Sequence, residues 1–266
     1  MGAAQRLHPG DENYPNDPNR WKWSWLDPLF WWAWDNGINP VVYVYLPNDT
    51  VAPGRSHEGY LWLCYLLCAR YNLPWLEIWN EPNGPDPGSF LQPHMYKDRL
   101  GAGSWGARMA GKNPLIGGLS SKGNIDPVTY LWQLKYYGVT PDWYSGIALH
   151  PYGANRDEVI SNVTYVTTSK PPGWLDFREL WVTEFGWNTE QNPRNWRWKT
   201  PQDQADAIMN TMHSLPSAGV KRSYIFTWRN FCNDADGNPP YCKAGIREGD
   251  NTPKPAYTAL KNHNTP

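Results

Sequence analysis

The sequence predicts an α/β fold with parallel strands, of the (β/α)8-barrel type. Short apolar runs alternate along the 266 residues with longer amphipathic segments, which is typical of strands joined by crossover helices. The length suits one barrel domain, which needs roughly 250 residues. Because we find no internal repeat, low-complexity tract or linker, we expect residues 1–266 to form a single domain.

Six segments are expected to be strands. Val41–Leu46 is rich in β-branched and aromatic residues and ends at a Pro-Asn-Asp turn. The other five are Trp75–Asn80, Pro114–Leu119, Ser145–His150, Glu179–Glu184 and Arg222–Trp228. Ala4–His8 is a short candidate for a seventh strand. A closed barrel has eight strands, so either the first strand–helix unit is missing or an unconventional segment fills that place.

Helical periodicity is found between the expected strands. The segments Trp25–Asn36, Glu58–Tyr71, Val128–Tyr137 and Pro201–Ala218 fit amphipathic helices. Cys64 and Cys68 are four residues apart in the second of these, so they share one helix face, where we expect two small buried residues.

Composition favours a flat, polar, uncharged ligand. The chain has 18 Trp and 16 Tyr but only 6 Phe, and Trp and Tyr provide surfaces on which sugar rings stack, although about half of the Trp should fill the core. Lys+Arg number 24 and Asp+Glu 25 without runs of one sign, which argues against nucleic-acid and acidic-membrane partners.

The longest apolar stretch, Leu29–Trp34, is too short to cross a bilayer. The His residues are scattered, so we expect no metal or other cofactor.

Polar, reactive residues follow several expected strands. In (β/α) barrels the carboxyl ends of the strands form the catalytic face, so these residues should meet there. Two carboxylates on one face suit the cleavage of a glycosidic bond, because one can protonate the leaving oxygen while the other attacks the anomeric carbon. The residues concerned are Asn80, Glu81, His150, Tyr152, Glu184 and Trp228.

Four motifs carry a resemblance to a known group. Trp79-Asn80-Glu81-Pro82, His150-Pro151-Tyr152, Thr183-Glu184-Phe185-Gly186 and Trp228 resemble glycoside hydrolase clan A, which has TIM-barrel folds, and in particular its cellulase-like family 5 and xylosidase-like family 39. The resemblance implies a retaining double displacement on a β-linked glycan, with Glu81 as acid/base and Glu184 as nucleophile. It also implies that His150 and Tyr152 are an active-site pair and that Trp228 forms the floor under the reacting sugar. With these three residues we assign Asn80 to substrate binding, since it could hydrogen-bond the sugar 2-OH, and Tyr152 could also hold the nucleophilic carboxylate.

Other interpretations stay open at this point. A non-catalytic carbohydrate-binding protein on a degenerate scaffold is one alternative, and a transglycosylase with the same residues is another. The Trp excess favours an extended cleft and hence an endo-acting enzyme. An incomplete barrel would leave two unpaired strand edges, which a dimer could cover. We expect Glu77 to be buried and paired with an Arg, and Trp79 and Trp187 to be either core or cleft wall.

Cys232 and Cys242 flank a polar loop, and their spacing suits a disulfide worth about 2–3 kcal/mol. Such a bond favours an exported protein. Met1–Gly10 has no apolar segment typical of a signal peptide, as expected also of a mature chain. We therefore expect a secreted or extracytoplasmic protein.

Overall fold

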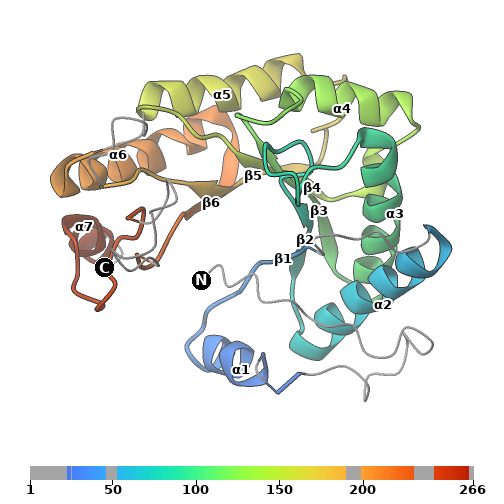
Figure 1. Ribbon diagram of the computed structural model, residues 1–266, viewed down its shortest axis with the longest axis horizontal. Helices are drawn as coiled ribbons and strands as arrows, with labels where there is room; N and C mark the ends of the chain where they lie inside the picture. Colours follow the sequence, from blue (N-terminus) through green and yellow to red (C-terminus); the bar gives the residue numbers. More distant parts are fainter. Residues whose placement is uncertain (1–22, 25, 46–52, 190–198, 231–242, 264–266) are drawn as a thin grey trace. The chain divides into compact units, whose positions relative to one another are not determined.

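A computed structural model describes residues 23–24, 26–45, 53–189, 199–230 and 243–263 (Figure 1). Six strands are present in these residues: β1 (Val42–Val44), β2 (Trp75–Asn80), β3 (Asn113–Ser120), β4 (Gly146–His150), β5 (Glu179–Phe185) and β6 (Val220–Ile225). The α-helices are α1 (Asp27–Asp35), α2 (Pro53–Tyr71), α3 (Pro93–Met109), α4 (Pro127–Tyr136), α5 (Arg156–Ser169), α6 (Pro201–Ser214) and α7 (Pro255–His263). Two short 3-10 helices are η2 (Pro141–Trp143) and η3 (Pro216–Ala218).

The strands follow one another in the sheet in sequence order, β1-β2-β3-β4-β5-β6. The pairs β1–β2, β2–β3 and β5–β6 are parallel, and between consecutive strands the chain passes through at least one helix. This arrangement confirms the predicted α/β fold class. The described residues hold six of the eight strands of a closed barrel, so an incomplete barrel fits the structure.

The chain divides into two compact units. One is built from the described residues of Ala4–Ala148 and Lys170–Glu179 and is called the β2 unit below, and the other, the β5 unit, from those of Leu149–Ser169 and Leu180–Pro266. The boundary falls within β4 and after the first residue of β5, so each unit is made from separated stretches of chain. That residues 1–266 act as a single domain stays a prediction.

In the β2 unit, buried tyrosines line the layer between sheet and helices. Tyr60 Oη donates to the carbonyl of Val44 at 2.7 Å, and Tyr96 Oη to that of Ile78 at 2.8 Å. Both rings are almost completely buried. Because each hydroxyl has an acceptor, these rings add apolar burial without an unpaired polar group. Of the 14 Trp in the described residues, five are buried, fewer than the half that was expected: Trp23, Trp79, Trp174, Trp181 and Trp187.

Helices α2 and α3 lie side by side in this unit (Figure 1). A Cβ on Gly106 of α3 would lie 2.3 Å from the Leu61 carbonyl oxygen of α2, so only glycine permits this approach. Cys64 and Cys68 are both fully buried, and both are free cysteines. The prediction that they are small buried residues on one face of the helix is confirmed.

The β5 unit packs α6 beside α7 (Figure 1). Gln204 of α6 is fully buried, and its Nε2 donates to the Trp187 carbonyl at 2.7 Å and approaches those of Ala244 and Gly245 at 3.3 and 3.4 Å. One helix side chain therefore fixes the segment after β5 to the segment 243–254. This helix ends at Ser214 instead of the predicted Ala218, because Pro216 lacks the N–H that would continue it, and η3 follows.

The last strand is shifted towards the N-terminus from its predicted position. β6 was expected at Arg222–Trp228 but runs from Val220 to Ile225, so Trp228 follows the strand instead of closing it. The candidate strand at Ala4–His8 and the expected disulfide between Cys232 and Cys242 lie outside the described residues.

Candidate active site

In the β2 unit, Glu81 comes directly after β2 on a strained backbone. The φ angles of Trp79 and Glu81 are +77° and +42°, in the left-handed region that non-glycine residues seldom adopt. Gly84 N–H donates to the Glu81 carbonyl at 2.7 Å and closes a tight turn. Such strain persists only where surrounding contacts hold it, and it is frequent at functional sites.

Asn83, fully buried, holds this turn. Its Nδ2 donates to the carbonyls of Ser120 and Ile125, both at 2.8 Å, and its Oδ1 accepts from the Ser120 N–H at 2.8 Å. The amide thus ties the loop after β2 to the loop after β3. Asn83 was not among the predicted site residues, although an Asn two positions after Glu81, in a Pro-Asn-Gly turn, is a signal that points to it.

Asn80 is the last residue of β2. Its Oδ1 is buried and has no hydrogen-bond partner within the described residues. Buried polar atoms in native proteins are nearly always paired, so this oxygen is available for a ligand donor. Glu77, three residues earlier, is buried as predicted, and its Oε1 accepts from the Gly118 N–H at 2.6 Å, while its pairing with an Arg stays a prediction. Trp79 is buried and donates to the Ser89 carbonyl, so it is core instead of cleft wall.

In the β5 unit, three predicted residues meet at one carboxylate oxygen. Tyr152 Oη donates to Glu184 Oε2 at 2.7 Å, and His150 Nδ1 lies 3.7 Å from the same oxygen. His150 is completely buried, whereas the Glu184 side chain is 18 % exposed. A phenol donor to this oxygen favours the ionised carboxylate. The group is therefore suited to act as an anionic nucleophile.

Neighbouring side chains hold these residues and the segment after β4 in place. His150 is the last residue of β4, and Thr183 Oγ1 lies 3.1 Å from its Nε2. Asn162 of α5 donates from Nδ2 to the Tyr152 carbonyl at 3.0 Å. Trp187, fully buried, donates from Nε1 to the Gly153 carbonyl at 2.9 Å and is therefore core. The contacts with Asn162 and Trp187 fix the carbonyls of Tyr152 and Gly153 in the segment after β4.

Trp228, three residues beyond β6, also belongs to the β5 unit and is 42 % exposed. The structure thus brings His150, Tyr152 and Glu184 together in one unit, with Trp228 in the same unit, and places Asn80 and Glu81 at the end of β2 in the other. The roles assigned to these six residues stay predictions.

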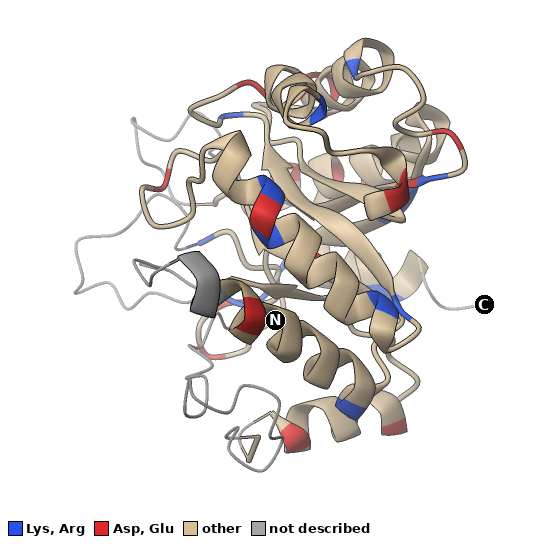
Figure 2. Cartoon of the chain, turned by 90° about the vertical axis from the view of Figure 1, so that its right-hand side faces the viewer, with Lys and Arg blue, Asp and Glu red and all other residues tan. Residues whose placement is uncertain are grey.

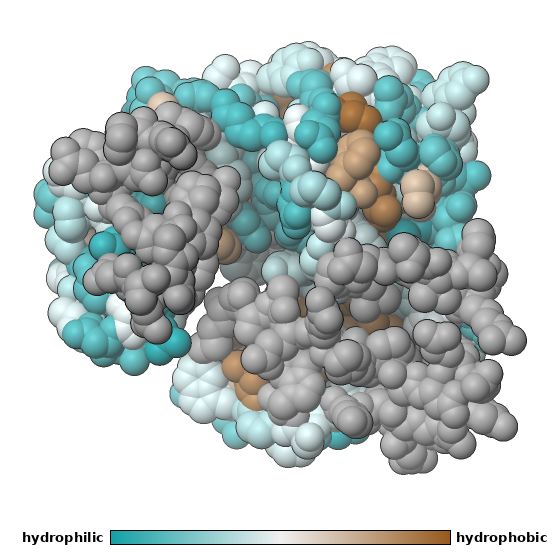
Figure 3. Space-filling view, in the orientation of Figure 1, coloured by the Kyte–Doolittle hydropathy of each residue, from teal (hydrophilic) through white to brown (hydrophobic). Residues whose placement is uncertain are grey.

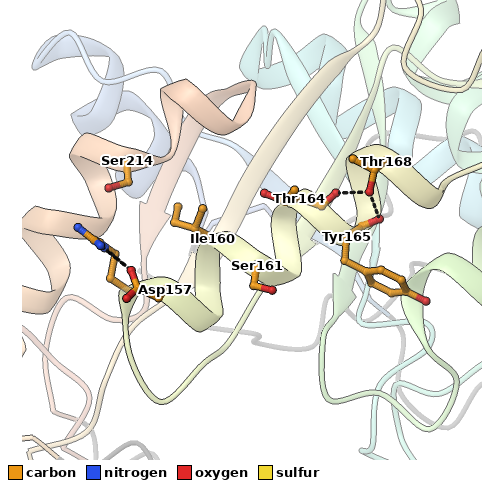
Figure 4. A pocket seen from close by; sticks show the side chains of 8 residues that line it. Asp157, Ile160, Ser161, Thr164, Tyr165, Thr168 and Ser214 are labelled. Carbon is orange, nitrogen blue, oxygen red and sulfur yellow. Dashed lines mark hydrogen bonds and ion pairs between the residues drawn. The ribbon is translucent and has the colours of Figure 1, made fainter.

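A cavity of about 600 Å³ lies elsewhere, on the outer face of α5 (Figure 4). Its lining includes Asp157, Ile160, Thr164 and Tyr165 of α5 and Ser214 at the end of α6. Teal, hydrophilic residues predominate at the upper left of Figure 3, where Figure 1 draws α5. Because none of the six predicted site residues lines the cavity, we do not assign the chemistry to it.

Solved structures share this fold. A family 39 glycoside hydrolase from the gut symbiont Bacteroides cellulosilyticus WH2 matches 88 % of this chain with 21 % identity and a TM-score of 0.62. A monomeric β-xylosidase from Caulobacter crescentus CB15 matches 92 % with 17 % identity and a TM-score of 0.65. Fungal β-1,4-galactanases match 92 % with 13 % identity and a TM-score of 0.66.

The fold is that of barrel-type glycosidases. The match agrees with the resemblance to clan A seen in the motifs. The chain spans 52 % and 57 % of the first two structures and 84 % of the galactanase. No protein-family model and no curated protein matches the sequence. Within the described residues, none of the helices has the length and apolar character needed to span a bilayer.

Proposed function

We propose that the protein is a retaining glycoside hydrolase that cleaves a β-linked poly- or oligosaccharide. The observation that carries the proposal is the Tyr152–Glu184 hydrogen bond of 2.7 Å, which favours the anionic carboxylate, in a chain with the glycosidase-type fold. The activities stated for the matching xylosidase and galactanases are compatible with a β-linked glycan substrate.

In the proposed reaction, Glu184 attacks the anomeric carbon while Glu81 protonates the leaving glycosidic oxygen. The C–O bond to the leaving sugar breaks, and a glycosyl ester to Glu184 forms. Glu81, now ionised, removes a proton from water, which displaces Glu184 and releases a sugar of the original anomeric configuration. Tyr152 keeps Glu184 ionised before the attack and donates to the same oxygen.

Substrate contacts follow from the environment of each side chain. The buried Asn80 Oδ1, for which the described part of the chain provides no partner, is suited to accept from a sugar hydroxyl, such as the 2-OH, whose hydrogen bonds strengthen in the transition state. The half-exposed indole of Trp228 offers a face for a sugar ring. His150 is buried beside Glu184 and limits the positions of its carboxylate.

We further propose that the enzyme acts in the endo mode on an extended glycan. We also propose that the chain is a single catalytic domain and that the protein is secreted or extracytoplasmic. Figure 2 shows Lys and Arg interspersed with Asp and Glu on the face in view, which suits an uncharged ligand better than nucleic acid. We also propose that a dimer could cover exposed strand edges of an incomplete barrel.

The first test is reducing-sugar release from a panel of β-glucans, xylans, mannans and aryl β-glycosides. We expect release by the wild type and its loss, by at least about 10³-fold, in Glu184→Gln, with glycan binding retained. Glu179→Gln is the matched control, because Glu179 begins the same strand at its opposite end. Wild-type turnover by Glu184→Gln would refute the nucleophile assignment, and binding without release by the wild type would favour the carbohydrate-binding alternative.

A second test separates the two carboxylate roles by the stereochemistry of azide rescue. With an activated aryl β-glycoside, Glu184→Gly plus azide should give the α-glycosyl azide, because azide replaces the missing nucleophile. Glu81→Ala plus azide should give the β-glycosyl azide, because azide attacks the glycosyl ester in place of activated water. The opposite pattern would exchange the two assignments. Products longer than the substrate would identify a transglycosylase.

A further inference from the structure

The indole of Trp228 has two neighbours that lie 19 and 29 residues further along the chain. The guanidinium of Arg247 lies 5.5 Å from the centroid of the Trp228 ring and 4.4 Å from that of Tyr257. The rings of Trp228 and Tyr257 meet edge to face, with centroids 5.6 Å apart and planes at 79°. One cation therefore touches both rings of an aromatic pair, and cation–π contacts of this type orient both partners.

The backbone brings these residues together. Arg247 N–H donates to the Trp228 carbonyl at 3.2 Å, and Asn230 N–H donates to the Arg247 carbonyl at 2.9 Å. Gly245 approaches so closely that a Cβ there would lie 2.2 Å from the Asn230 nitrogen. The segment that carries Trp228 and the segment that carries Arg247 thus run against each other with little freedom to separate.

The Arg247 side chain is itself fixed. Its Nε donates to the Asn251 carbonyl at 2.7 Å, and the residue is half-buried. Trp228 remains 42 % exposed although Arg247 and Tyr257 contact it. An aromatic ring that is held on one side and open on the other is what stacking on a sugar requires, because a mobile indole would lose freedom on binding.

We propose that Arg247, with Tyr257, is a positioning residue that holds the Trp228 indole ready to stack on the substrate sugar. This inference rests on the proposed function, in which Trp228 is a substrate contact. Arg247 acts through Trp228 and needs no contact with the reacting atoms. Its removal should therefore weaken catalysis only as long as Trp228 is present.

The first experiment reads the position of the ring without turnover. In protein labelled with 5-fluorotryptophan, the ¹⁹F signal of Trp228 is assigned from its loss in Trp228→Phe. We expect Arg247→Met to move and broaden this signal towards that of an exposed indole, and Arg247→Lys, which keeps the cation, to restore most of the shift. An unchanged signal in Arg247→Met would overturn the inference.

The second experiment is a double-mutant cycle on kcat/KM. We expect Arg247→Met to lower kcat/KM about 3- to 10-fold in the wild type and to have no further effect in a Trp228→Ala background. Equal losses in both backgrounds would indicate a general structural role and refute positioning through Trp228. If no glycan is cleaved by the wild type, the proposed function fails, whereas the ¹⁹F result still decides the placement of the ring.

Arg222→Met is the matched control. The guanidinium of Arg222 lies 5.2 Å from the ring centroid of Trp181 in the same unit. The substitution therefore removes a cation–π contact of similar length. Trp181 is fully buried and has no proposed role in binding. We expect this variant to leave both the Trp228 signal and kcat/KM unchanged.

Discussion

Tyr152 Oη and Glu184 Oε2 are joined by a hydrogen bond of 2.7 Å, although the residues are 32 positions apart in the chain. A phenol that donates to a carboxylate stabilises its anion, and a charge-assisted bond is worth about 1.5–3 kcal/mol. The contact therefore favours the ionised form of the proposed nucleophile.

We expect Tyr152→Phe to lower kcat by about 10- to 100-fold, because this bond is lost at the reacting carboxylate. The acid limb of the pH–rate profile should move to higher pH, since the anion of Glu184 loses a donor. Kinetics over pH 3–9 check both effects. Tyr165→Phe, which alters an exposed tyrosine of α5, should leave the profile in place. A normal acid limb in Tyr152→Phe would contradict this account.

Gly117→Ala should destabilise the protein by about 3 kcal/mol. The added Cβ would lie 2.4 Å from the Ile78 carbonyl oxygen and 2.6 Å from that of Trp79, where the neighbouring strand cannot yield. Urea unfolding measures the change. Gly59→Ala is the control: it meets open space in α2, so we expect a gain of about 0.5–1 kcal/mol. Equal stability of the two variants would disprove the tight approach of β3 to β2.

Because Lys254 is buried, we expect the free energy of unfolding to depend on pH in an unusual way. Burial lowers its pKa to about 8, assisted by the Lys243 ammonium and opposed by Glu248, while its Nζ donates to Thr189, Asn230 and the Lys243 carbonyl. Between this pKa and the ordinary value of 10.5, the unfolded chain holds a proton that the folded protein has released. The free energy of unfolding should therefore rise with pH in this window, by up to about 3 kcal/mol relative to Lys254→Met.

Denaturant unfolding at several pH values from 7 to 10 tests this slope. Because other groups titrate in the same range, the comparison is the difference between the wild type and Lys254→Met at each pH. A constant difference would mean that Lys254 keeps its proton throughout, with its three acceptors outweighing burial.

Counting reactive thiols tests which of the four cysteines are free and which are bonded. Burial raises the pKa of Cys68 to about 12 and that of Cys64 well above its usual value, so neither should react with a thiol reagent in the native protein. After denaturation without reductant we expect two reactive thiols, in the peptide with Cys64 and Cys68, and after reduction all four. Four thiols before reduction would exclude the predicted bond between Cys232 and Cys242.

The strands could be predicted from sequence because buried parallel strands are short, nearly continuous apolar runs. Helix α3 was not predicted, and its glycines explain why. Gly103 and Gly106 lower the helical propensity, yet they let α3 approach Tyr60 and the backbone of α2. Packing therefore overrides local preference at this helix.

The candidate site, too, could be predicted only in part from the sequence. Glu81, Glu184, His150 and Tyr152 could be selected because polar residues that follow apolar runs stand out in the sequence. The support around them could not. Asn83 acts through the loop after β3, and Arg247 reaches Trp228 only because two distant segments pair. Such partners have no common pattern along the chain.

The division of the chain also bears on the order of its synthesis. The unit that carries Glu81 includes Lys170–Glu179, where the Trp174 carbonyl accepts from Tyr144 and Arg178 donates to the Pro141 carbonyl. A ribosome must therefore finish all of α5 before the carbonyl that accepts from Tyr144 has been made. A fragment that stops at Ala148 lacks Trp174, so its Tyr144 hydroxyl has to find another acceptor or stay hydrated.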